Sequence, residues 1–66
     1  MIILKKIKKC CYNKVILSDN TSIEIEPGLV NIIRKRENIA YYNVKNKKIT
    51  YVDNSTINNN KIYQII

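Results

Sequence analysis

Acidic and thiol side chains are the first groups in this sequence to examine for chemistry. Glu24 and Glu26 have one residue between them, so in a strand their carboxylates share a face at about 7 Å. Acid–base catalysis could use carboxylates at this spacing. The chain has no histidine and no Gly-x-Ser-x-Gly segment, so no catalytic partner for this pair is evident. Cys10 and Cys11 are adjacent, and adjacent side chains of an extended chain leave on opposite faces, which predicts two free thiols. We therefore expect a protein that is not an enzyme and that binds no metal or other cofactor.

Basic side chains form the most suggestive pattern. Twelve Lys and Arg against five Asp and Glu give a net charge of +7, which draws a protein towards polyanions and acidic partners. Ten of the twelve are lysines, and the residues favoured by AT-rich coding (Asn, Lys, Ile and Tyr) fill 39 of 66 positions. The charge therefore reflects either function or base composition.

One cluster of these cations is a candidate binding surface. It combines the basic end of an expected helix with the following hairpin, where a tyrosine could stack on a base or enter a partner's pocket. The alternative is a solvated helix end and a lysine-rich turn that discourages edge pairing. The predicted binding residues are Arg34, Lys35, Arg36, Tyr41, Tyr42, Lys45, Lys47 and Lys48.

The elements that would position these side chains begin with a hairpin. Residues 15–17 and the alternating segment 21–26 read as two strands, closed at Asp19-Asn20 because Asn tolerates positive φ. Pro27-Gly28 ends the second strand, and apolar residues at positions 29, 32 and 33 predict one short amphipathic helix over 29–37.

A second hairpin is predicted from residues 39–44 and 49–52, around a polar turn at 46–48. Asp53-Asn54 repeats the turn chemistry of the first hairpin, and residues 61–66 form either a helical turn, which we favour, or a terminal edge strand. The sequence thus predicts a single α+β domain over 1–66. Its small curved antiparallel sheet would consist of two hairpins, with one short helix between them and a terminal helical turn.

Other side chains are expected to have structural roles. Because the chain lacks Phe and Trp, Tyr12, Tyr51 and Tyr63 should supply bulk to the core. The lysines at positions 5, 6, 8 and 9 should protect an edge strand from pairing with other chains.

Two spaced segments carry a resemblance to a known family. They are VILSDNT, residues 15–21, and KITYVDN, residues 48–54, which is followed by KIY at 61–63. Together they resemble the small bacterial family called domain of unknown function 2442. That family has Gly where this chain has Asn20 and Asn54, and Trp where it has Tyr51.

The resemblance spans nearly the whole chain and implies a fold and a role. The fold would be a small α+β domain with curved antiparallel strands and one helix. The role would be that of a non-enzymatic accessory partner in small operons, including toxin–antitoxin pairs. A second resemblance, through MIIL at 1–4 and IYQ at 62–64, is to the carbon-storage RNA-binding regulators, whose Gly-rich strands this chain lacks.

These observations predict a small basic binding protein of the cytoplasm. The chain begins with apolar residues and then lysines, the reverse of a secretory signal, and no apolar run reaches membrane-spanning length. We expect a regulator or inhibitor that occupies a partner protein or nucleoprotein, of the phage-type inhibitor or antitoxin-like kind. The alternative is direct RNA or DNA binding, with Lys and Arg on phosphates and Tyr stacked on bases. So small a core also favours a homodimer or a tight complex, formed through a strand edge or the Ile-rich terminus.

Overall fold

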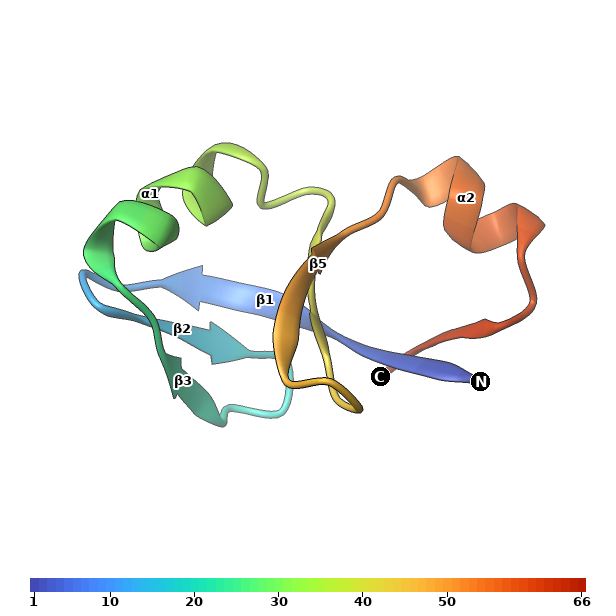
Figure 1. Ribbon diagram of the computed structural model, residues 1–66, viewed down its shortest axis with the longest axis horizontal. Helices are drawn as coiled ribbons and strands as arrows, with labels where there is room; N and C mark the ends of the chain where they lie inside the picture. Colours follow the sequence, from blue (N-terminus) through green and yellow to red (C-terminus); the bar gives the residue numbers. More distant parts are fainter.

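The computed structural model describes all 66 residues as one sheet with two short helices (Figure 1). The α+β fold class predicted from the sequence is confirmed. In chain order the elements are β1 (Ile2–Cys10), β2 (Lys14–Leu17), β3 (Ser22–Glu24), α1 (Pro27–Lys35), β4 (Ala40–Asn43), β5 (Lys48–Tyr51), α2 (Asn54–Asn59) and β6 (Tyr63–Ile65).

The sheet is built around the long first strand. Its order is β3-β2-β1-β4-β5 with antiparallel neighbours, and β6 pairs in parallel with the start of β1. Both predicted hairpins, β2–β3 and β4–β5, are present. The edge-strand role expected for the lysines at 5, 6, 8 and 9 is wrong, because β1 has neighbours on both sides. Lysines are tolerated there because most of these side chains project to solvent while their backbone pairs.

Local chemistry explains the first turn. Leu17 N–H donates to the Thr21 carbonyl (2.8 Å), Asn20 N–H donates to the Leu17 carbonyl (2.9 Å), and Asn20 has φ 70°. This is a three-residue hairpin loop whose last position is left-handed, a conformation that Asn adopts more readily than most residues. The side chain of Asp19 strengthens the turn by accepting from the backbone N–H of Thr21 (3.1 Å).

The sheet buries side chains on both faces. The first core contains Ile7, Val15, Leu17, Ile33 and Ala40, and the second contains Leu4, Tyr41 and Val52. Because neighbouring residues of a strand point to opposite faces, Ala40 and Tyr41 serve different cores. Burial on both faces explains the apolar run at 39–42.

Each helix covers one of these cores. Helix α1 begins with Pro27 at its first turn, where a missing N–H costs nothing. It buries Val30 and Ile33, of which Ile33 belongs to the first core. The predicted stripe is thus partly wrong, since Leu29 and Ile32 are exposed. Figure 1 shows the two helices at opposite ends of the molecule. Neither of them has the length and apolar content needed to cross a membrane.

Helix α2 is the element that the sequence interpretation missed. Asp53 does not repeat the Asp19 turn but caps the helix, its Oδ1 accepting from Thr56 N–H (2.7 Å) and Ser55 Oγ (3.0 Å). Ile57 then packs against the second core.

The last residues form a strand rather than the favoured helical turn. Ile2 N–H donates to the Ile62 carbonyl (2.5 Å) and Ile66 N–H to the Leu4 carbonyl (2.9 Å). Ser18 Oγ also donates to the Ile66 carbonyl (2.8 Å). These bonds satisfy backbone groups along β1 that no local turn could reach, which is why the strand alternative prevails.

Candidate binding groove

A groove of about 410 Å³ lies between β3 and β5, the strands at the two ends of the sheet order. Its walls come from β3 with the residue that follows, from α1 and from the β4–β5 hairpin. Seven of its ten lining residues are hydrophobic. The lining residues are Ile23, Glu24, Ile25, Leu29, Ile33, Tyr42, Lys47, Lys48, Ile49 and Tyr51.

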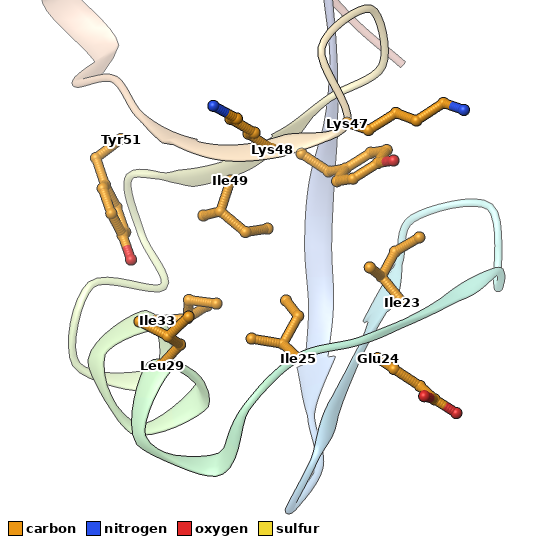
Figure 2. A pocket seen from close by; sticks show the side chains of 10 residues that line it. Ile23, Glu24, Ile25, Leu29, Ile33, Lys47, Lys48, Ile49 and Tyr51 are labelled. Atoms are coloured by element: carbon orange, nitrogen blue, oxygen red, sulfur yellow. The ribbon is translucent and has the colours of Figure 1, made fainter.

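Isoleucine side chains form the floor of the groove. Figure 2 shows Ile49 of β5 directed towards Ile33 of α1 and Ile25. Leu29 stands one helical turn before Ile33, so α1 presents both residues on one face. Leu29 is 50% exposed and Tyr51 is 37% exposed, so apolar surface remains open to solvent here. A groove with this lining can hold aliphatic or aromatic groups of a ligand.

Cations border the groove along β5. Lys47 and Lys48 stand at the start of the strand, and in Figure 2 their ammonium groups point away from the apolar floor. At the other end, the Arg36 guanidinium carbon lies 5.3 Å from the centre of the Tyr51 ring, a cation–π contact. The charges therefore flank the apolar surface rather than fill it.

The structure brings some of the predicted binding residues together. Tyr42, Lys47 and Lys48 line the groove, and Arg36 reaches it through Tyr51. Tyr41 does not take part, because it is only 4% exposed on the opposite face of the sheet. Lys6 covers its ring, with Nζ 5.1 Å from the ring centre, so Tyr41 is unavailable for stacking on a base.

The remaining predicted cations lie elsewhere. Arg34 contacts Asn31 (3.2 Å) and acts electrostatically on Cys10, at the far end of β1. Lys48, in contrast, pairs with Asn43, which in turn faces Leu4 near the start of β1. The helix end and the hairpin turn are thus at opposite ends of the β4–β5 hairpin, and Arg34, Lys35 and Lys45 do not line the groove.

The floor residues were not among the predicted binding residues. Ile23 and Ile25 alternate with acidic residues, which signalled a one-sided strand but not a groove. Leu29 was assigned only to the apolar stripe of the predicted helix. The signal that could have identified the groove is the apolar stripe of the helix at positions 29, 32 and 33, which is wider than one small core can bury.

Of the three other tyrosines, which were expected to supply bulk to the core, only one does so. Tyr63 is half-buried and packs against the second core, as expected. Tyr12 was expected in the core but is 79% exposed, because it lies in the turn between β1 and β2. Tyr51 was also expected in the core but is exposed and lines the groove.

Few of the cations are neutralised within the molecule. The only salt bridge joins Lys5 Nζ to Asp19 Oδ2 (2.6 Å). This hydrogen bond, together with those from Thr21, holds the pKa of the Asp19 carboxyl well below its usual value. The other basic side chains form no salt bridge and remain free to attract anionic partners.

Thiols and carboxylates do not gather into a reactive cluster. Cys10 and Cys11 are free, and burial raises the pKa of the Cys10 thiol. No group of three or more Cys, Asp or Glu side chains is placed to hold a metal ion. A second hollow, of about 560 Å³, is lined mainly by polar residues, namely Lys6, Lys8, Glu37, Asn38 and Asn54 with Ile7 and Tyr41.

Comparison with known proteins identified no relative of this chain. No protein-family model matches the chain, and neither the curated proteins nor the solved structures contain a significant match to it. The resemblance to domain of unknown function 2442 stays a prediction.

Proposed function

We propose that this protein is a non-enzymatic regulator or inhibitor that acts by occupying a partner protein or nucleoprotein. The observation that carries the proposal is the groove, in which open apolar surface is bordered by cations. Apolar surface supplies affinity when it is covered, and free charges select and steer the partner. Blocking the partner's own contacts would be the mechanism. We place this activity in the cytoplasm, where two unpaired thiols stay reduced.

Affinity capture from the native host, followed by reconstitution, tests the proposal. The tagged protein is incubated with native extract at about 150 mM salt, and each retained protein or nucleoprotein is purified and recombined with it. We expect one partner that binds in a defined ratio and loses its own activity or assembly as the complex forms. If every retained protein fails to bind on recombination, the proposal is wrong.

Direct nucleic-acid binding is the competing function, supported by the net charge of +7 and by the single internal salt bridge. Salt dependence separates the two functions. Affinity that falls steeply and linearly in log salt, with a slope equivalent to several phosphates, would favour nucleic acid. A shallow slope, with no nucleic-acid binding at about 150 mM salt, favours a protein partner.

A further inference from the structure

We propose that the groove receives an extended acidic segment of a partner protein, which adds to the sheet as a strand beside β5. The occupant would alternate apolar and acidic side chains. This inference rests on the proposed binding function and specifies the chemistry of the partner.

The outer side of β5 is open to a further strand. β5 ends the sheet order, with β4 on one side and no strand on the other. Edge strands carry backbone N–H and C=O groups that an added strand can pair with. The other edges, β3 and β6, have only three residues each, against four in β5, and β3 continues almost at once into α1. β5 is therefore the better edge for docking.

Inward side chains of the added strand would meet apolar surface. Ile49 and Tyr51 are two residues apart, so both face the groove, as their place in its lining shows. A strand beside them would direct every second side chain towards Ile25, Leu29 and Ile33 across the groove. The volume of about 410 Å³ lies within the range of about 300–1,000 Å³ usual for ligand pockets.

Outward side chains of the added strand would meet positive charge. Lys48 precedes Ile49 and therefore leaves the sheet on the opposite face, as Figure 2 shows. Lys47 stands beside it, in the turn before β5. Neither lysine has a salt-bridge partner within the molecule. Carboxylates at alternate positions of the incoming strand would complement them, whereas lysines there would be repelled.

The test uses two peptides of about eight residues, one alternating glutamate with valine and one alternating lysine with valine. Each is titrated into the ¹⁵N-labelled protein while amide resonances are followed. We expect the glutamate peptide alone to bind and to shift the amides of Ile49 and Tyr51 first. A glutamate peptide N-methylated at alternate residues cannot complete the strand ladder and should bind at least about tenfold more weakly.

Two charge-matched double variants test the cationic border. Lys47→Glu with Lys48→Glu should weaken binding of the glutamate peptide about tenfold or more. Lys9→Glu with Lys61→Glu changes the net charge equally at exposed positions outside the groove and should change binding by less than about twofold. Circular dichroism confirms that both variants fold.

Several outcomes would overturn the inference. They are equal binding of both peptides, equal weakening by both variants, tight binding of the N-methylated peptide, or absence of binding by the glutamate peptide. A dimer that dissociates in the Lys47→Glu, Lys48→Glu variant without any peptide binding would assign the groove to a second copy of the chain. A captured host partner that the glutamate peptide does not displace would refute this inference and leave the proposed function standing. Peptide binding without any host partner would refute the proposed function alone.

Discussion

Asp19 shows how one side chain can organise a turn from an exposed position. It accepts from Thr21 N–H and Oγ1 and from Lys5 Nζ of the adjacent strand, so one carboxylate joins the β2–β3 turn to the middle of β1. These hydrogen bonds favour the charged form and lower the pKa of the carboxyl. Asp53 caps the start of α2, and the hydrogen bonds that it accepts from Thr56 and Ser55 likewise lower its pKa.

Stability should therefore depend on pH in the acid range. The pKa of Asp19 is lower in the folded protein than its value of about 3.9 in the unfolded chain. Its contribution to stability is then complete above about pH 4 and is lost as the pH falls through the folded-state pKa. We expect Tm, followed by circular dichroism, to fall with pH below about pH 4.

The Asp19→Asn variant is the control for this pH dependence. At about pH 7 this variant should have a lower Tm than the wild type. Its Tm should also fall less as the pH is lowered below about 4, and the fall that remains should come from Asp53. If the Tm of Asp19→Asn falls in acid as much as that of the wild type, Asp19 is not a source of the pH dependence.

At the scale of elements, the apolar residues of α1 differ in their burial. Val30 and Ile33 are buried, whereas Leu29 and Ile32 are at least two-fifths exposed. The same periodicity in the sequence therefore describes both buried and exposed apolar residues of α1. Only the position of the sheet under α1 distinguishes them.

Adjacent isoleucines provide a direct test of this arrangement. Ile33, only 2% exposed, packs in the first core, so Ile33→Val should cost about 0.5–1.5 kcal/mol and Ile33→Ala about 2–5 kcal/mol in free energy of unfolding. Ile32 is 44% exposed, so Ile32→Ala should cost less than about 1 kcal/mol. Urea denaturation measures all three variants. Equal losses for both alanine variants would mean that α1 is rotated relative to this description.

The elements also differ in how far the sequence predicted them. The hairpin at Asp19-Asn20 follows from local rules, since alternating strands flank residues that suit the turn. Helix α1 begins two residues before the predicted helix, because Pro27 starts the helix as well as ending the strand. β6 was less predictable, because its partner, the start of β1, lies at the other end of the sequence.

Unbalanced positive charge is the main property of the whole molecule. The net charge is +7 and only Lys5 has a salt-bridge partner, so repulsion among the other cations opposes the compact state. Since salt screens such repulsion, with a Debye length of about 10 Å at 0.1 M, the folded protein should gain stability as salt is added.

Thermal melts in increasing sodium chloride measure this effect. We expect Tm to rise between about 10 mM and about 150 mM salt, and to rise less in the Lys9→Glu, Lys61→Glu variant, which carries less net charge. A Tm that falls with added salt would mean that attractive pairs outweigh the repulsion.

The sequence by itself determined the net charge, both hairpins, the place of α1 and the α+β class. These depend on residue types and on contacts between near neighbours in the chain. The tertiary structure alone decided that β1 is central and that residues 63–65 pair with it. It also decided that the predicted cations divide between two ends of the molecule and that an apolar groove lies between β3 and β5. The physical reason is that burial and strand pairing are satisfied over the whole chain at once, so the face that a side chain presents depends on partners many residues away.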